Sequence, residues 1–259
     1  MKNYLIDHKR WFQALLVLIG ILLLIQYLKI DITLIFNDLH YVVELMNDMF
    51  PPNYAILFEN NTVFNSIIQT IAMAYLGTLI GGLIAFLISI IASNNIFNLK
   101  LIGSLAKWFL SLIRVLPSLI VILIFVVAVG PGPFAGVLTI IFGTIGTLGK
   151  LFTESLENLD STSAQSLRST GVNKLQTFKY AIWPEFIPAF ISNLLYCFDI
   201  NMRAAVALGI FGGGGIGYKL FLAMRVLHYK DAIALIICII ILLLIIENLS
   251  NYLRTLVLK

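Results

Sequence analysis

Apolar residues dominate this chain in long runs that short polar stretches interrupt. A helix that crosses a bilayer needs about 20 mostly apolar residues, and five runs have this character. A sixth run is shorter and carries four glycines, which is typical of a helix packed closely against other helices rather than lipid. We therefore expect an all-α, polytopic membrane protein with six spans: Phe12–Leu28, Ile67–Ala92, Leu105–Val129, Phe134–Leu151, Phe186–Ile210 and Ala232–Ile246.

The composition agrees with a membrane environment. Only 12% of the residues are charged and 60% are hydrophobic, against about a quarter and about half in soluble domains. Cys197 and Cys238 both lie inside apolar runs, so we interpret them as packing groups rather than a disulfide. The first run follows Lys9 and Arg10 like a signal peptide, but it is longer than a usual signal core and no small-residue cleavage site follows it. It is therefore predicted to be a retained anchor.

Lysine and arginine positions orient the spans, because cytoplasmic loops keep positive charge. These residues precede the first span, follow the last, and occupy the loops between the second and third and between the fourth and fifth. The segment Asp31–Ser66 carries five acidic residues and no lysine or arginine. Both termini are therefore predicted to be cytoplasmic, in the plasma or inner membrane. Lys219, Arg225 and Lys230 depart from this rule on the outer side, either by chance or as an anion-attracting surface.

Three parts are predicted along the chain. Residues 1–65 hold the anchor and an extracytoplasmic amphipathic segment, in which charges interrupt the apolar residues too often for a span. That pattern favours a helix lying along the outer surface. Residues 66–250 form the main transmembrane domain, and residues 251–259 form a cytoplasmic tail.

One cytoplasmic segment, Glu154–Pro184, is polar and mostly compatible with helix. Ser161 or Thr162 can cap a first short helix, and Gly171 is placed to end it because glycine tolerates left-handed backbone angles. A second helix is expected from about Lys174 to the proline at 184, which cannot continue a helix. Two short helices joined at a glycine form a knob that suits docking onto a partner protein. The alternative is an amphipathic loop lying on the lipid headgroups.

This segment resembles the coupling loop of binding-protein-dependent ABC importer permeases, whose pattern is Glu-Ala-Ala, three residues, Gly, nine residues, Ile-x-Leu-Pro. Gly171 and Pro184 stand at the matching separation. The remaining positions of the pattern are held by Gln165, Ser166 and Leu167 in place of Glu-Ala-Ala, by Ala181 in place of Ile and by Trp183 in place of Leu.

The wider chain is similar to phosphonate-type permeases over roughly residues 65–250. The likeness is carried by Arg114–Asn158, by Leu195–Gly217 and by the loop between them. This resemblance implies a type I importer permease domain over residues 66–250, a homodimeric pore, two cytoplasmic ATP-binding cassette subunits and an extracytoplasmic solute-binding protein. It also implies phosphonates or related phosphorus oxyanions as substrates, with no cofactor in this chain and no nucleic-acid partner.

The sequence carries no convincing nucleotide-binding motif. The segment GTLGK at 146–150 lacks the earlier glycine of a P-loop and the Ser or Thr that should follow Lys150. Gly212, Gly214 and Gly217 fit the dinucleotide pattern GxGxxG, which has meaning only between a strand and a helix, whereas here it lies between two spans. ATP hydrolysis is therefore expected in partner subunits, and this chain is not expected to be an enzyme.

Three alternatives compete with an importer of phosphorus oxyanions. An ion-coupled secondary transporter would need no cytoplasmic knob and would show inverted repeats, which we do not find. A membrane-embedded enzyme would need titratable residues clustered at one membrane face, whereas His8, His40 and His228 are scattered. An ABC permease for a different small solute stays open as the substrate alternative.

Charged side chains at membrane depth are costly, and they usually face a protein interior or a water-filled route. Arg114 lies three residues before Pro117, and Asp199 and Arg203 lie four apart, with Asn201 between them in sequence. Either the pair neutralises itself within the bundle, or the arginines donate to a crossing oxyanion, since guanidinium geometry matches phosphate-like oxygens. All four are candidates for the translocation pathway.

A glycine run follows the fifth span and does not favour a regular helix. It suits either an outer loop that gates the pore or contacts the binding protein, or a passive turn. Its residues are Gly212, Gly213, Gly214, Gly215 and Gly217. In addition, Pro117 and Pro188 are expected to bend their helices.

Overall fold

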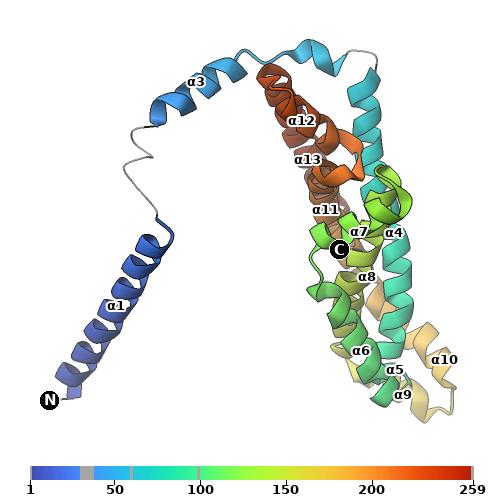
Figure 1. The fold of residues 1–259 in the computed structure, drawn as a ribbon. Helices are drawn as coiled ribbons and strands as arrows, with labels where there is room; N and C mark the ends of the chain where they lie inside the picture. The colour runs from blue at the N-terminus through green and yellow to red at the C-terminus, as the bar shows by residue number, and fades with distance from the viewer. Residues whose placement is uncertain (1, 30–37, 59–60, 98–99, 258–259) are drawn as a thin grey trace. The chain divides into compact units, whose positions relative to one another are not determined.

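The computed structural model describes residues 2–29, 38–58, 61–97 and 100–257, and every regular element among them is helical. The expected all-α architecture is therefore confirmed. The chain divides into two compact units, Met1–Phe50 and Pro51–Lys259. The first unit holds α1 (Lys2–Tyr27) and α3 (Leu39–Met49). The second holds η1 (Tyr54–Leu57), α4 (Thr62–Ala92), α5 (Asn94–Phe97), α6 (Lys100–Val115), α7 (Ser118–Val129), α8 (Pro133–Glu157), α9 (Ser161–Ser169), α10 (Lys174–Thr177), η3 (Phe178–Ile182), α11 (Trp183–Leu208), η4 (Gly209–Gly213), α12 (Gly215–Arg225) and α13 (Tyr229–Val257) (Figure 1).

The first unit consists of one apolar and one amphipathic helix. The apolar part of α1 is Gln13–Tyr27, which nearly matches the predicted span but is shorter than the roughly 20 residues that a bilayer requires. α3 covers 11 residues of the predicted amphipathic segment, and none of them is buried. Residues 30–37 of that segment lie outside the described residues.

Four helices of the second unit are long and apolar enough to cross a membrane. They are α4, α8, α13 and the continuous helical stretch Lys174–Gly213 that contains α11, and each includes one predicted span. A fifth span is counted if α6 and α7, which meet at a sharp bend, are taken together. Within the described residues the count is thus four or five, so the predicted number of six is not confirmed.

The predicted span Leu105–Val129 falls on two helices rather than one, and it is a single span only if the bent pair is counted together. α6 ends at Val115, α7 begins at Ser118, and the two are bent by 85°. Pro117 lies in the break, because its ring would collide with the carbonyl of Ile113 in a continuous helix and because it disfavours a helical residue before it. The bend predicted at Pro117 is therefore confirmed, whereas α11 continues past Pro188 as one helix.

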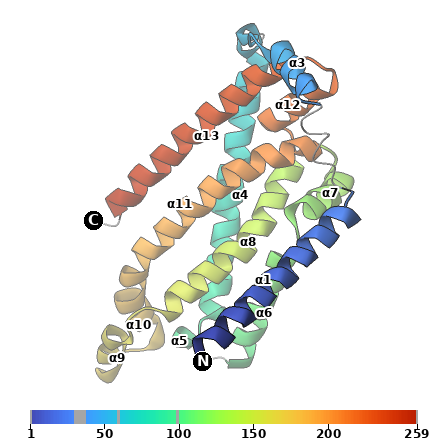
Figure 2. The same ribbon diagram turned by 90° about the vertical axis from the view of Figure 1, so that its left-hand side faces the viewer.

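Glycines bring α4 and α8 into close contact at the centre of the second unit, where the two helices cross (Figure 2). A Cβ atom on Gly81 of α4 would lie only 2.7 Å from Thr144 Cβ and 2.9 Å from the carbonyl oxygen of Ile141. A Cβ atom on Gly77 would overlap the side chain of Ile140. Because no side chain fits between them, the two backbones approach closely, as in other membrane helix pairs with small interface residues.

Glycines of α8 likewise allow close contact with neighbouring helices. A Cβ atom on Gly146 would lie 2.9 Å from the Ile113 side chain of α6, and Gly149 is closed by Leu110 of the same helix. Gly143 differs, because a Cβ atom there would meet nothing within 4 Å. The predicted role in close helix packing is thus confirmed for Gly146 and Gly149, and also for Gly136, where a Cβ atom would lie 2.7 Å from Met73 Sδ of α4.

A polar junction joins α11 to these two helices. Asn201, which is only 8% exposed, donates through Nδ2 to Thr78 Oγ1 and to Thr144 Oγ1, both at 2.8 Å. The Thr78 hydroxyl in turn donates to the carbonyl of Ala74 at 2.6 Å. Buried amide groups need such partners, because an unpaired one costs free energy in an apolar interior. The junction therefore fixes the position of α11 along α4 and α8.

The glycine contact between α4 and α8 can be tested by adding one methyl group. We expect Gly81→Ala to destabilise the protein by about 1–3 kcal/mol, because overpacking against the Ile141 backbone forces the helices apart. Gly143→Ala is the matched control and should leave stability unchanged or slightly higher, since its Cβ meets open space. Denaturant unfolding in detergent measures both variants. Equal stability of the two would contradict this account of the packing.

Candidate functional site

The polar segment between α8 and α11 folds into two short helices at the end of the second unit opposite α12 (Figures 1 and 2). The prediction of Ser161 or Thr162 as the cap of the first helix is wrong by one or two residues. Asp160 is the cap, and its Oδ1 accepts from the Thr162 hydroxyl at 2.7 Å and from the Thr162 N–H at 3.0 Å. These two donors hold the pKa of Asp160 below its ordinary value, because they stabilise the carboxylate.

The glycine joint between the two helices is as predicted. Gly171 has φ +85°, a left-handed angle, and its N–H donates to the carbonyl of Arg168 at 3.1 Å. α9 therefore ends where glycine permits the turn. α10 then begins with a reciprocal cap, in which Asn173 and Gln176 each accept from the other's backbone N–H.

The expectation that the second helix stops at Pro184 is wrong. α10 passes into η3, a π-helical turn, and η3 passes directly into α11. Pro184 stands in the first turn of α11, directly after the wider π-helical turn, and the helical stretch continues past it. The segment is therefore continuous with a membrane-spanning helix.

An aromatic cluster fixes this segment to the bundle. Trp183 packs against Phe86 of α4 at 5.3 Å and Phe190 of α11 at 5.7 Å between ring centroids. Phe152 of α8 stacks on Phe190 at 4.9 Å, and Phe152 and Phe186 are fully buried. Sequence reasoning missed this cluster, although the four-residue spacing of Phe186 and Phe190 was a signal for one helix face. Its rings join the segment to three helices.

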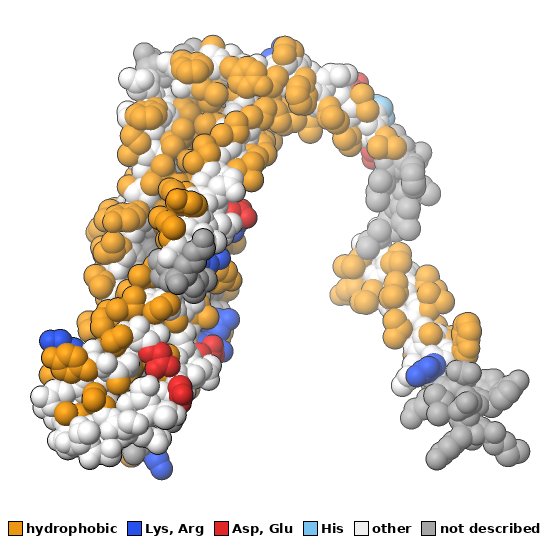
Figure 3. All heavy atoms as spheres, turned by 180° about the vertical axis from the view of Figure 1, so that it is seen from behind, with side chains coloured by type: hydrophobic (Ala, Val, Ile, Leu, Met, Phe, Trp, Pro, Cys, Tyr) orange, Lys and Arg blue, Asp and Glu red, His pale blue; other side chains and the backbone are white. Residues whose placement is uncertain are grey.

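The opposite side of the segment is open. Gln165 and Ser166 are exposed on α9, Leu167 is half-buried, and Leu175 of α10 has 73% of its surface exposed. A polar depression of about 470 Å³ is lined by Gln165 and by further residues of α9, α10 and the α5 region. Figure 3 shows acidic and basic side chains gathered toward this end of the second unit, whereas hydrophobic side chains cover much of the rest of the visible face.

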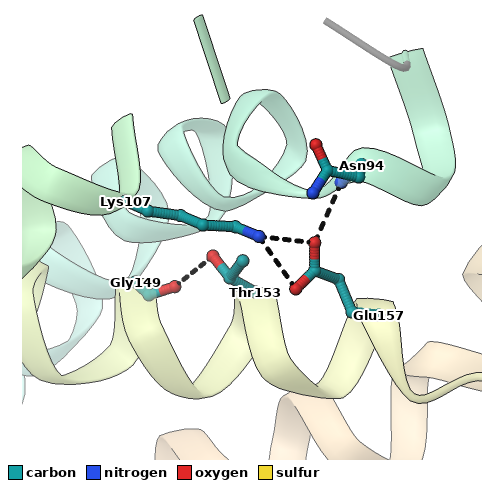
Figure 4. A network of polar contacts seen from close by, with 5 residues as sticks. All are labelled: Asn94, Lys107, Gly149, Thr153 and Glu157. Carbon is teal, nitrogen blue, oxygen red and sulfur yellow. Dashed lines mark hydrogen bonds and ion pairs between the residues drawn. The ribbon is translucent and has the colours of Figure 1, made fainter. Parts of the chain in front are cut away.

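An ion pair ties α6 to the base of α8 (Figure 4). The Lys107 ammonium lies 2.7 Å from Glu157 Oε1 and 3.0 Å from Glu157 Oε2. Oε1 also accepts from the backbone N–H of Asn94 at 3.1 Å, so α5 joins the same carboxylate. Glu157 is the last residue of α8, and the pair therefore braces the helix end that precedes α9 and α10. Sequence reasoning missed this contact, because its partners lie 50 residues apart.

Arg203 joins α11 to α13 through two ion pairs. Its Nη1 lies 2.9 Å from Asp199 Oδ2, and its Nη2 lies 2.8 Å from Glu247 Oε2. The predicted shared face of Asp199 and Arg203 is confirmed, while Glu247 is a partner that sequence reasoning missed. The signal for it was a lone acidic residue directly after the last apolar run. In the single chain the side chains of Arg203 and Glu247 are 47% and 45% exposed.

The other two candidate pathway residues lie elsewhere. Arg114 is exposed in the last turn of α6, beside the bend, and its backbone packs against Gly146. Asn201 is buried between α4, α8 and α11 and donates to threonines there. The structure thus brings Asp199 and Arg203 together and places Asn201 inside the bundle.

The glycine run forms a tight reversal between α11 and α12. Gly212, Gly214 and Gly215 have φ values of 95°, 76° and 70°, which side chains other than glycine rarely adopt. Gly217 packs directly on the carbonyl of Val206, so a side chain at 217 has no room.

Two further hydrogen bonds tie this turn to its neighbours. The Ile216 N–H donates to Thr70 Oγ1 of α4 at 2.9 Å, and the Gly132 N–H, just before α8, donates to the Gly212 carbonyl at 2.7 Å. Within the described residues no group of three or more His, Cys, Asp or Glu side chains is arranged to hold a metal ion.

Known proteins resemble this chain in sequence and in fold. It is 33% identical over 228 residues to the phosphate-import permease protein PhnE of Mycolicibacterium smegmatis, covering 88% of this chain but 42% of PhnE. It is 29% identical to the phosphite transport system permease protein PtxC of Stutzerimonas stutzeri, covering 87% of this chain and 81% of PtxC.

Among solved structures, a chain of an inward-facing MetNI methionine ABC transporter aligns with a TM-score of 0.67 at 15% identity, covering 75% of this chain and 95% of that one. A chain of a bacterial ABC transporter for alginate import aligns with a TM-score of 0.68 at 15% identity, covering 98% of each. At such identity these likenesses show the fold alone. Residues 77–258 match the family described as binding-protein-dependent transport system inner membrane component. The chain therefore belongs to this family, the membrane permease subunits of ABC importers.

Proposed function

We propose that this chain forms the translocation pathway of an ATP-driven importer for phosphonates or related phosphorus oxyanions. Its partners would be a second copy of itself, cytoplasmic ATP-binding cassette subunits and an extracytoplasmic solute-binding protein. One observation carries the proposal: an exposed two-helix segment at one end of the bundle is continuous with α11 and held by an aromatic cluster. Such a segment can receive a push from a partner and pass it to spanning helices.

The coupling role follows from how the segment is held. Movement of α9 and α10 cannot be absorbed at the joint with α11, because η3 and the buried rings leave no loop there. ATP binding by the partner subunits would draw two such segments together, and the pore would alternate between outward- and inward-open states. The driving free energy is the different affinity of these states for ATP. Gln165, Ser166, Leu167, Gly171 and Pro184 belong to this proposed coupling loop.

The pathway role follows from charge at membrane depth. Arg203 and Glu247 are about half exposed in the single chain, yet lipid is a costly neighbour for charged groups. Their face is therefore proposed to meet a second copy or a water-filled path. A guanidinium has five N–H donors, more than its bonds to Asp199 and Glu247 use. Asp199, Arg203 and exposed Arg114 are the pathway residues of this proposal, whereas buried Asn201 holds the bundle together.

The proposed orientation in the membrane puts an outer gate at the end of the bundle opposite the proposed coupling loop. With the coupling segment facing the cytoplasm, the turn at Gly212–Gly215 and Gly217 faces outward, and the chain's termini are proposed to be cytoplasmic. The turn packs on the link between α7 and α8, so its movement would open or close the bundle at this end. This supports Gly212, Gly213, Gly214, Gly215 and Gly217 as an outer gate.

The substrate class is supported by the relatives, whose names specify phosphate and phosphite transport. We expect the solute-binding protein that works with this permease to bind phosphite, phosphate or methylphosphonate, and the reconstituted complex to import the same anion in an ATP-dependent manner. Calorimetric titration of the binding protein, followed by uptake into proteoliposomes, measures both. Failure of every phosphorus oxyanion to bind, with uptake of another solute, would contradict the substrate class and leave the permease role standing.

The coupling segment can be tested at its exposed leucine. We expect Leu175→Asp to lower recovery of the ATP-binding subunits with the permease at least about tenfold, because burying a carboxylate against an apolar cleft is costly. Leu227→Asp is the matched control, since Leu227 is also exposed, at 65%, but lies after α12 at the opposite end. Copurification and binding-protein-stimulated ATPase activity are the readouts. Equal losses in both variants would contradict a docking role for α10.

Arg203 can be tested for more than charge neutralisation. We expect Arg203→Gln to abolish uptake while assembly and basal ATPase activity persist, because the donors to the anion are lost. The neutral triple variant Arg203→Gln, Asp199→Asn, Glu247→Gln removes the ion pairs without leaving unpaired carboxylates, and it should not restore uptake. Recovery of uptake in the triple variant would show that Arg203 serves only to neutralise its two partners. Loss of assembly in both variants would likewise assign Arg203 a structural role.

A further inference from the structure

A depression of about 440 Å³ lies beside the glycine turn. Its walls come from the first two turns of α4, the link between α7 and α8, the turn itself and the first residues of α12. The volume lies within the range of about 300–1,000 Å³ that is usual for small-molecule sites. Segments far apart in the sequence therefore converge on one concave surface large enough for a small hydrated anion.

The side chains of this depression favour an anion. Lys219 is the one charged group among the described lining residues, and none of those residues is acidic. Asn65 and Gln69 of α4 add amide donors, and Tyr218 adds a hydroxyl. Hydrogen bonds from such donors to a phosphorus oxyanion are charge-assisted, and they are therefore stronger than hydrogen bonds between neutral groups.

The hydrogen bonds that hold the walls of the depression do not use the side chains of Lys219, Asn65, Gln69 or Tyr218. The bonds from Gly132 N–H to Gly212 O and from Ile216 N–H to Thr70 Oγ1 join the turn to α8 and α4 through other atoms. Gly212 and Gly214 line the depression with backbone alone, and their positive φ angles exclude ordinary side chains. A ligand can therefore approach the backbone closely on this side.

We propose that this depression is an oxyanion-binding site, in which Lys219 supplies the charge and Asn65, Gln69 and Tyr218 supply hydrogen bonds. The anion occupies it between release from the binding protein and entry into the pore. This inference rests on the proposed function and deepens it by naming the residues that receive the substrate. It also separates Lys219 from the other outer basic residues of the sequence, Arg225 and Lys230, which are not among the lining residues.

The test uses the complete complex in proteoliposomes, with methylphosphonate, phosphite and inorganic phosphate as probes and saturating loaded binding protein. We expect Lys219→Gln to lower the anion transported per ATP about tenfold, the effect of losing one charged hydrogen bond. Lys219→Arg should stay near the wild-type value, and Lys230→Gln is the matched control that should be unchanged. Gln69→Glu, which places a carboxylate in the depression, should reproduce the loss without touching Lys219.

The outcomes separate this site from its rivals. The binding-protein concentration that gives half-maximal ATPase activity should be the same in wild type and Lys219→Gln. A rise in that concentration, with unchanged transport per ATP, would overturn the proposal in favour of protein docking. Wild-type transport by both Lys219→Gln and Gln69→Glu would overturn it outright. No uptake of any probe by the wild-type complex would instead contradict the proposed substrate class, and this inference with it.

Discussion

The close approach of α4 and α8 is the constraint on which the rest of the second unit depends. Gly81 leaves no space for a side chain opposite Thr144, and the same threonine accepts the buried amide of Asn201. These hydrogen bonds fix the position of α11 along the axes of α4 and α8. The aromatic cluster holds the start of α11 against the same helices. The position of the proposed coupling segment therefore depends on the glycine contact.

One helix also connects the two proposed functional regions at opposite ends of the second unit. α11 leads from the proposed coupling segment to the glycine turn without an intervening loop, so both ends belong to one helical rod. Arg203 ties that rod to α13 through Glu247, and the Lys107–Glu157 pair braces the base of α8 against α6. Both pairs connect helices that lie far apart in the sequence.

Much of the fold could be predicted because lipid imposes simple rules on sequence. Long apolar runs located α4, α8, α11 and α13, the glycines of α8 indicated close packing, and Gly171 marked the joint of the coupling segment. The size of the bend at Pro117 could not be predicted, since it depends on packing against α8. Pro184 was expected to stop the helix, but the wider π-helical turn before it lets the helical stretch continue. Lys107–Glu157 and Arg203–Glu247 join residues 50 and 44 positions apart, and no local pattern reveals such pairs.

The central claim is that the coupling segment and the spanning helices move as one body. It is tested most directly by spin-label distances in the reconstituted complex, with labels at exposed Ser166 of α9 and exposed Leu87 of α4 in a background lacking Cys197 and Cys238. Labelled chains are diluted with unlabelled ones, so that only distances within a chain are seen. The account predicts the same Ser166–Leu87 distance with and without ATP, while in undiluted chains labelled only at Ser166 the labels of two paired copies approach each other. A Ser166–Leu87 distance that changes on ATP binding would contradict it.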